Sequence, residues 1–220
     1  MNEDKADTRQ KLLLAALNLF AEQGIDGVSM RTINSMAGAK NASAVHYHFG
    51  SRVGILEAIL QYFLERLRPL KDDALQWYLS QPEPQLRDLL RTTLSPLLTI
   101  YYQDPQGKDL IRLLARIHLD GQPEARRLVN QYMGEMLQQL DAMLTDLLPD
   151  IPKDVLRRRI LVSLLTVIHC LSEMEWLSET PLGDLQNVSP VGMFSGFLDF
   201  LAGGITAPVS RTEDDFKCTL

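Results

Sequence analysis

The stretch "AKNASAVHYHFGSR", residues 39–52, decides the fold at the N-terminal end of the chain. It gathers amide, imidazole, phenol and basic side chains around small apolar residues and contains no carboxylate. Ala42, Val45 and Phe49 are spaced i, i+3 and i+7, which predicts that they form the buried face of a helix of about two turns. The outward face of this helix then carries four polar side chains: Ser43, His46, Tyr47 and His48.

The segments on either side complete a helix-turn-helix pattern. Ahead of the stretch, apolar residues at helical spacing predict a first helix that ends at Gly24, and Ser29 is a typical cap for a short second helix. After it, Ser51 is expected to cap a long fourth helix that Pro69 ends. Four residues form the expected inner face of the second helix: Met30, Ile33, Met36 and Ala37.

Charge is distributed unevenly along the chain. The net charge of −6 argues against non-specific nucleic-acid binding by the whole protein. Residues 1–68, however, hold 8 Lys/Arg against 7 Asp/Glu, whereas residues 69–220 hold 14 against 21. The segment from Gly27 to Leu56 contains no carboxylate, where an even spread predicts roughly four. A local basic stripe of this kind is what phosphate binding requires, even on an acidic protein.

Beyond residue 69 the periodicity stays helical, and Pro or Gly marks each junction. No strand-like alternation extends over any length, so we predict an all-α fold of about nine helices, in which three short helices lead. The expected longer helices follow the fourth: 70–80, 84–103, 108–119, 123–148, 152–179 and 189–203.

Composition also bears on the compartment. Only two cysteines occur, so no disulfide framework is implied. The N-terminal "MNEDKADTRQK" lacks the apolar region of a signal peptide, and the longest apolar run, residues 160–171, is too short to span a bilayer. We therefore expect a cytoplasmic protein with no membrane partner.

Residues 8–68 resemble the N-terminal domain of the TetR family of transcriptional regulators. The stretches "TRQKLLLAALNLFAEQGIDGVSMRTINSMAGA" and "AVHYHFGSRVGILEAIL" carry the resemblance. In that family "G-x-S/T-x-R-x-I-x-x-x-A-G" forms the second helix, and "Y-H-F-G-S-K/R" closes the recognition helix and begins the fourth. The chain departs from this pattern in one respect, because ten residues instead of nine separate Gly38 from Phe49. The extra residue falls in the "AKN" turn.

The resemblance implies double-stranded DNA as a partner and assigns phosphate contacts to particular residues. Ser29 and Arg31 correspond to the start of the second helix, which touches the backbone. Tyr47 and His48 correspond to the aromatic and histidine pair that holds phosphate at the end of the recognition helix. Arg52 stands where a basic residue opens the fourth helix and pairs with the backbone.

Other polar residues of the stretch are candidates for reading bases. Short or planar polar groups on a two-turn helix fit the major groove, where they reach base edges. We interpret Asn41, Ser43 and His46 in this way, and Lys40 as a contact to either a base or a phosphate. Short polar helices with histidine also occur on surfaces with a purely structural role, so the pattern alone leaves both interpretations open.

The larger part of the chain contains no catalytic motif that we recognise. Nucleophile elbow, P-loop, Cys-x-x-Cys and His-Glu-x-x-His spacings do not occur in the sequence. His169 and Glu173 are spaced i, i+4, as two metal ligands on a helix would be, but we favour a paired, buried histidine. We therefore predict a protein that is not an enzyme and that carries neither a cofactor nor a metal.

The resemblance further implies that the larger domain binds a small-molecule effector between its helices. Methionine and aromatic residues at helical spacing are more often ordinary core, so the choice of lining residues is a hypothesis. The candidates combine such residues with a few polar ones: Tyr101, Tyr102, Arg112, His118, Tyr132, Met133, Met136, His169, Glu173 and Trp176.

The last two predicted helices are candidates for a dimer interface. They present apolar side chains along one side: Leu161, Leu164, Leu165, Ile168, Met193, Phe197, Phe200 and Leu201. Family members pair such helices across a two-fold axis into a four-helix bundle, which would set two recognition helices about 34 Å apart on a palindrome. Alternatively, both helices bury these residues in their own core.

The sequence thus predicts a homodimeric, ligand-responsive DNA-binding regulator, and we favour a repressor that an effector releases. Residues 1–52 would form the DNA-binding domain, with the helix over 51–68 linking it to an effector-binding and dimerisation domain over 53–203. Residues 204–220 have little to bury and are expected to form a flexible tail. The alternative is an all-α enzyme or carrier that binds an apolar small molecule in its helical bundle.

Overall fold

A computed structural model describes residues 3–39, 41, 43–119, 123–178, 181 and 188–209. Within these ranges the chain forms α-helices and no strand, which confirms the predicted all-α class; the helices number ten, against about nine expected. They are α1 (Glu3–Gln23), α2 (Met30–Met36), α3 (Ala44–Phe49), α4 (Arg52–Leu79), α5 (Leu86–Gln103), α6 (Gly107–Leu119), α7 (Pro123–Leu147), α8 (Lys153–Ser172), α9 (Met174–Ser178) and α10 (Pro190–Thr206).

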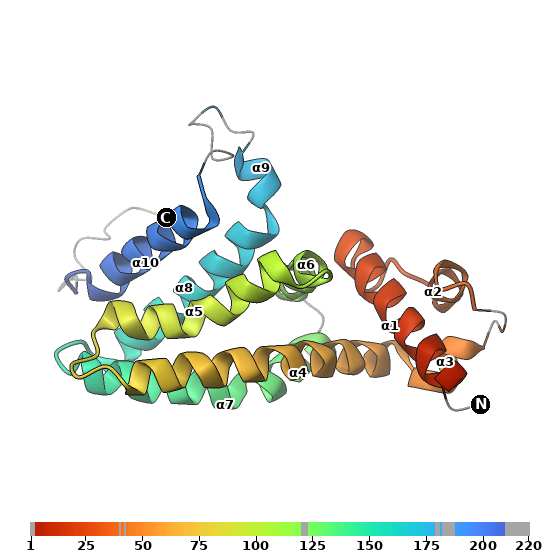
Figure 1. Cartoon of the computed structure of the whole chain (residues 1–220), viewed down its shortest axis with the longest axis horizontal. Helices are drawn as coiled ribbons and strands as arrows, with labels where there is room; N and C mark the ends of the chain where they lie inside the picture. Colours follow the sequence, from red (N-terminus) through yellow and green to blue (C-terminus); the bar gives the residue numbers. More distant parts are fainter. Residues whose placement is uncertain are drawn as a thin grey trace, which may run out of the picture.

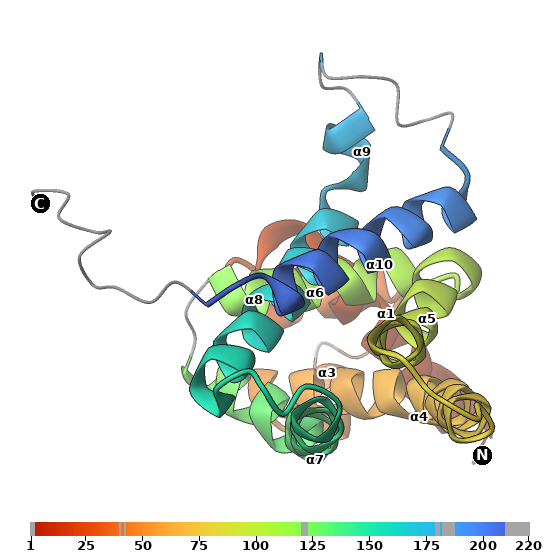
Figure 2. The ribbon, with the colours of Figure 1, turned by 90° about the vertical axis from the view of Figure 1, so that its left-hand side faces the viewer.

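The helices form a small unit and a larger bundle. Helices α1, α2 and α3 lie together at one end of the molecule, and α4 runs from that end along the base of the bundle (Figure 1). Helix α4 packs against α5 and α7, while α6 packs against both α8 and α1. Helix α10 covers α5 and α8 on the side of the bundle away from α4 and α7 (Figure 2). The small unit therefore meets the bundle through α4 and through the contact of α1 with α6.

Serine caps begin α2 and α4, as predicted. The backbone N–H of Thr32 donates to Oγ of Ser29 at 3.0 Å, and the N–H of Gly54 donates to Oγ of Ser51 at 3.1 Å. Each serine satisfies one of the amide donors that a helix N-terminus leaves without a partner. Gly50 has a φ of 69°. This left-handed conformation ends α3 and turns the chain directly into α4.

The predicted end of the fourth helix at Pro69 is wrong. Helix α4 continues through this residue to Leu79, so the separate helices expected over 51–68 and 70–80 are one helix of 28 residues. Pro69 lies on the exposed side of α4, whereas Leu67 and Tyr78, on either side of it, are buried in the core. Burial of both flanking segments outweighs the hydrogen bond that proline cannot donate.

Two other predicted boundaries differ from the structure. The helix expected over 152–179 is divided into α8 and α9 at Glu173, whose N–H donates to the carbonyl of His169 and ends α8. At the other end, α10 continues to Thr206, with Ile205 buried, so the expectation of a flexible tail is wrong for residues 204–206. Residues 210–220 lie outside the described part of the chain. No helix in the described ranges is both long and apolar enough to cross a membrane.

The exposed proline in α4 generates a stability prediction. Replacing Pro69 with alanine restores a backbone donor inside the helix and removes the clash of the ring with the preceding turn, so we expect stabilisation by about 1–3 kcal/mol. For a chain of this size this corresponds to a Tm higher by roughly 2–12 °C. Pro82→Ala, in the exposed connection between α4 and α5, is the control and should leave Tm unchanged or slightly lower. A fall in Tm for Pro69→Ala would contradict our account of α4.

Candidate nucleic-acid interface

Helix α3 presents a polar face to solvent. Ser43, His46 and Tyr47 are exposed and His48 is half-buried, whereas Val45 is fully buried and Phe49 is half-buried against the core. The i, i+4 relation of Val45 and Phe49 thus produces the predicted division of α3 into an inner and an outer face. The helix has six residues and is too short to be stable alone, so its orientation depends on what holds its inner face.

Asn34 of α2 is one of the groups that hold α3. Its side chain is buried, with 4% exposed, and its Oδ1 accepts the backbone N–H of Val45 at 3.1 Å. Ser43, at the N-cap of α3, makes no capping hydrogen bond with its own side chain. The amide of Asn34 therefore satisfies a free donor of α3 from across the turn and fixes α3 against α2.

This arrangement corrects the predicted inner face of α2. Ile33 is buried and Met30 and Ala37 are half-buried, but Met36 is 54% exposed and Asn34 takes the inward position. Hydropathy alone could not identify a polar residue as part of the core. Asn34 is buried because its side chain accepts a hydrogen bond from a backbone donor at the start of the next helix, which has no partner within that helix.

The turn before α3 is ordered by its own side chains. Oδ1 of Asn41 accepts hydrogen bonds from the backbone N–H of Ser43 at 2.9 Å and from its Oγ at 2.8 Å. Such an Asx turn accommodates the additional residue in this segment. Base contacts by these two residues stay a prediction, and each carries a structural role as well. Lys40 and Ala42 lie outside the described residues.

The C-terminal end of α3 is aromatic and lies close to α1. The rings of Tyr47 and His48 pack edge to face with centroids 5.1 Å apart. The guanidinium of Arg9, an exposed residue of α1, lies 5.2 Å from the centre of the Phe49 ring. Arg9 is therefore a further candidate for a phosphate contact beside Tyr47. Sequence reasoning missed it because the spacing within α1 does not reveal which residue reaches α3.

Two arginines near α3, Arg31 and Arg52, differ in their polar contacts. Arg31 is exposed on α2 and makes no ion pair within the described residues. The guanidinium of Arg52 instead donates to the carbonyl of Val28 at 2.8 Å and lies 3.4 Å from Oδ1 of Asp26. Arg31 is thus free to meet a phosphate, whereas the geometry of Arg52 favours a role in tying α4 to the loop before α2. The predicted phosphate contact of Ser29 stays untested, since its Oγ caps α2.

The contact of α1 with α6 is polar and specific. Arg116 of α6 donates to the carbonyls of Ala21 and Glu22 at the end of α1, at 2.6 Å each. Asn18 of α1 donates to Asp109 of α6 at 3.1 Å. Arginine thus satisfies carbonyls at the end of α1 and ties α6 to the small unit.

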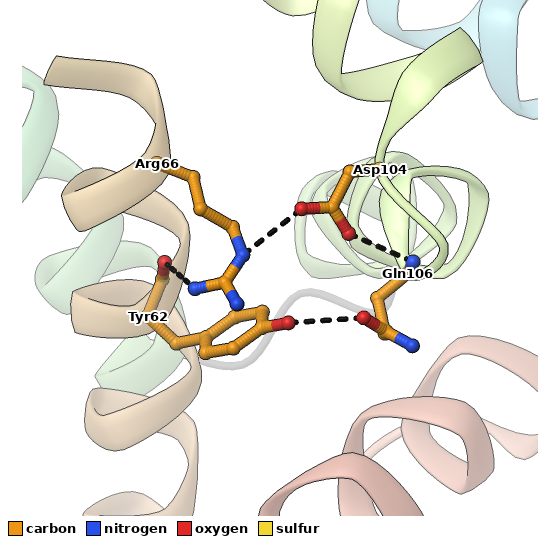
Figure 3. Close-up of polar contacts among 4 residues, drawn as sticks. All are labelled: Tyr62, Arg66, Asp104 and Gln106. Atoms are coloured by element: carbon orange, nitrogen blue, oxygen red, sulfur yellow. Dashed lines mark hydrogen bonds and ion pairs between the residues drawn. The ribbon is translucent and has the colours of Figure 1, made fainter. Parts of the chain in front are cut away.

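The turn between α5 and α6 is connected to α4 through four residues (Figure 3). Arg66 of α4 pairs through Nε with Asp104 at 2.9 Å and stacks over the ring of Tyr62. The Tyr62 hydroxyl donates to Gln106 at 3.0 Å, and Asp104 accepts the backbone N–H of Gln106 at 2.8 Å. Burial raises the pKa of Tyr62, so the hydroxyl keeps its proton and remains a donor. We call these four residues the α4–α6 bridge.

Sequence profiles match both parts of this architecture. A profile described as "Bacterial regulatory proteins, tetR family" matches residues 12–59, and one described as "Tetracyclin repressor-like, C-terminal domain" matches residues 79–204. The chain belongs to the TetR family. It is therefore a transcriptional regulator with an N-terminal helix-turn-helix domain, as the sequence predicted.

Solved structures share the fold at low sequence identity. FadR from Bacillus subtilis, crystallised with stearoyl-CoA, is 16% identical with a TM-score of 0.64, covering 89% of this chain and 98% of its own. A TetR-family regulator from Bordetella parapertussis is 15% identical with a TM-score of 0.64, covering 92% and 97%. FadR from Bacillus halodurans is 14% identical with a TM-score of 0.61, covering 90% and 96%. No curated protein matches the chain.

The predicted effector residues of this TetR-family chain do not converge on one cavity. Tyr132, Met133 and Met136 line a groove between α4 and α7, with a volume of about 310 Å³. Arg112, Glu173 and Trp176 line an open cleft beside the end of α1, with a volume of about 550 Å³. Neither the groove nor the cleft is lined by the other four candidates: Tyr101, Tyr102, His118 and His169.

These remaining candidates form two aromatic pairs. The rings of His118 on α6 and His169 on α8 meet edge to face with centroids 6.5 Å apart, and those of Tyr101 and Tyr102 pack edge to face at 4.9 Å. His169 is thus paired with a histidine, as we favoured, but it is half-buried. Glu173 is exposed and lies beyond the end of α8, so it does not share a helical face with His169.

The predicted dimer residues are partly exposed. On α8, Leu161 and Leu165 are exposed, and on α10 Phe200 is 67% exposed. Two further apolar residues of the same helices are exposed: Val162 and Val191. Four further candidates are half-buried: Leu164, Ile168, Met193 and Phe197. Leu201 was assigned wrongly, because it is 2% exposed and belongs to the side of α10 that packs in its own chain.

The contact between α2 and α3 can be tested by removing the buried amide. Asn34→Ala leaves the Val45 N–H buried without a partner, and we expect the free energy of unfolding to fall by about 1–3 kcal/mol. Asn41→Ala, in the exposed turn, is the control and should cost less than about 1 kcal/mol. Urea unfolding followed by circular dichroism measures both. Equal losses would show that Asn34 does not anchor α3.

Proposed function

We propose that this protein is a homodimeric repressor whose two α3 helices bind a palindromic operator and which a small effector releases. The observation that carries the proposal is the outward face of α3, which is exposed, polar and set in a segment without carboxylates. Ser43, His46 and Tyr47 reach base edges or phosphates when α3 enters a major groove. A DNA target places the protein in the cytoplasm.

Dimerisation is supported by the exposed apolar side chains of α8 and α10. Leu161, Val162 and Leu165 on α8 and Val191 and Phe200 on α10 face solvent in the single chain. Large apolar side chains exposed on two adjacent helices favour a partner. We propose a second copy of this chain as that partner, because one helix-turn-helix contacts too little DNA to be selective. Two copies about 34 Å apart would bind successive turns of a palindrome.

Release by an effector is supported by the connections between the bundle and the DNA-binding unit. A ligand bound against α4 favours one position of that helix, which the α4–α6 bridge passes to α6 and Arg116 passes to α1. The separation of the two α3 helices then changes. Since a relative of the same fold was crystallised with stearoyl-CoA, an effector with an apolar portion is consistent with this scheme.

The alternative is an enzyme or carrier that uses the bundle for an apolar molecule. Family membership argues against it, because the family consists of transcriptional regulators. Retention on random DNA at low salt, lost as salt rises, supports the regulator. Turnover of a substrate without any DNA affinity supports the alternative.

Base and phosphate contacts predict different behaviour in DNA binding. Arg31→Ala should weaken binding to every duplex alike and reduce the slope of log affinity against log salt by about one. His46→Ala should relax the preference at particular base pairs, where discrimination falls by about 1–3 kcal/mol. The measurement is titration of a duplex selected from a random pool by the unaltered protein, and of its single-base variants, at several salt concentrations.

The matched control is Arg127→Ala, an exposed arginine on α7 that lies outside the DNA-binding unit. It should change neither the affinity nor the salt slope. If Arg31→Ala and His46→Ala both behave like this control, α3 is not the DNA-reading element.

The proposed dimer surface is tested by placing a charge on the exposed side of α10. Phe200→Glu should raise the dimer dissociation constant at least a hundredfold, equivalent to about 3 kcal/mol, without unfolding the exposed helix face. Leu79→Glu is the control, since Leu79 is 70% exposed at the end of α4 and outside α8 and α10. Analytical ultracentrifugation measures both. An unchanged dimer in Phe200→Glu, or a monomeric unaltered protein, would refute this interface.

A further inference from the structure

A narrow apolar slot lies between α4, α5 and α7. Its walls are formed mainly by leucine and methionine side chains, among them Leu75, Leu89, Leu97 and Met143, and its volume is about 50 Å³. It adjoins the groove of about 310 Å³ between α4 and α7, and Leu67, Lys71 and Met136 line both spaces. The apolar slot and the more polar groove therefore adjoin at these three side chains.

Lys71 stands where the two parts meet. It is half-buried, and its ammonium donates to Oε1 of Gln139 on α7 at 3.1 Å. Within the described residues it makes no ion pair, although the exposed carboxylates of Asp72 and Glu135 also line the outer groove. Lys71 thus offers an anion a cation without a carboxylate partner among the described residues, and Arg68 adds a second cation to the outer groove. The methylene stem of Lys71 meanwhile continues the apolar wall.

Two of the three helices around the slot, α4 and α5, contain an internal proline. Pro69 precedes Lys71 by two residues on α4, and Pro96 lines the slot on α5. Each removes one hydrogen bond between successive turns, so the helix bends there more readily than elsewhere. The slot is too small for an organic ligand as it stands, since such sites measure roughly 300–1,000 Å³. Flexible methionines and two bendable walls allow it to widen when an apolar chain enters.

We propose that slot and groove together bind a small amphipathic carboxylate, with its hydrocarbon chain in the slot and its carboxylate against the Lys71 ammonium. This inference rests on the proposed function, because it names the class of effector. An anion at Lys71 gains a charge-assisted hydrogen bond, and the chain gains burial against leucine and methionine. Binding widens the slot by moving α4 relative to α5, and so acts on the helix that carries the α4–α6 bridge.

The test uses the full chain and three probes built on a ten-carbon chain, namely decanoate, decanol and decyltrimethylammonium, below their micelle concentrations. Isothermal titration should give decanoate the highest affinity, decanol about tenfold less, and the cation no measurable binding. Affinity should increase from hexanoate to decanoate as more methylene groups enter the slot. Equal affinity for decanoate and decanol, or no dependence on chain length, would overturn the proposal.

Two variants test whether the carboxylate binds at Lys71 and not at any exposed lysine. Lys71→Met keeps the apolar stem and should reduce decanoate affinity about tenfold while leaving decanol unchanged. Lys108→Met, which removes an exposed lysine on α6 outside the slot and groove, should change neither. Loss of decanol binding in Lys71→Met would show that the substitution disturbs the slot and would remove the case for a carboxylate contact.

DNA binding without a probe is measured in parallel and keeps the two proposals distinguishable. Duplex binding with no affinity for any of the three probes overturns the amphipathic carboxylate and leaves the repressor intact. Decanoate binding by a chain that does not bind duplex DNA overturns the repressor instead. With both intact, decanoate should lower operator affinity in the unaltered protein, and about tenfold more of it should be needed for Lys71→Met.

Discussion

The ion pair of Arg66 with Asp104 is the contact on which the relation between the two parts of the molecule depends. It joins the middle of α4 to the turn that begins α6, and the hydrogen bond of Tyr62 to Gln106 reinforces it from one helical turn away. Helix α6 holds α1 through Arg116, and α4 follows directly from α3. The DNA-binding unit is consequently supported at two points by helices that are themselves tied together. A displacement of α4 that keeps these contacts therefore displaces the start of α6 as well.

Local sequence signals predicted local features well. Ser29 and Ser51 were recognised as helix caps because a cap depends only on the next three residues. The inward and outward faces of α3 were predicted from the spacing of apolar residues, which is also a local property. Pro69 misled the prediction because continuation of α4 is decided by burial of Leu67 and Tyr78 against other helices, which no local pattern reports. The break at Glu173 was missed likewise, since helical periodicity continues across it.

Features that depend on contacts distant in sequence were not predictable in detail. Arg52 turns toward Val28, and Asn34 reaches Val45, only after the chain has folded back on itself. The effector candidates were chosen by residue type, and the structure distributes them over separate cavities and aromatic pairs. Leu201 and Phe200 are adjacent apolar residues, yet Leu201 is buried and Phe200 is exposed. Successive residues of a helix point about 100° apart, and the packing of α10 on α5 and α8 decides which of the two is covered.

The six-residue length of α3 has a consequence for how such a protein diversifies. Burial of Val45 and the hydrogen bond from its N–H to Asn34 of α2 hold the helix in place. The exposed side chains of His46 and Tyr47 contribute little to the core. Substitutions at exposed positions usually change stability by less than about 0.5 kcal/mol. Gene duplication followed by drift at these outward positions can therefore generate new target preferences while the scaffold persists, so recognition and folding evolve under largely independent selection.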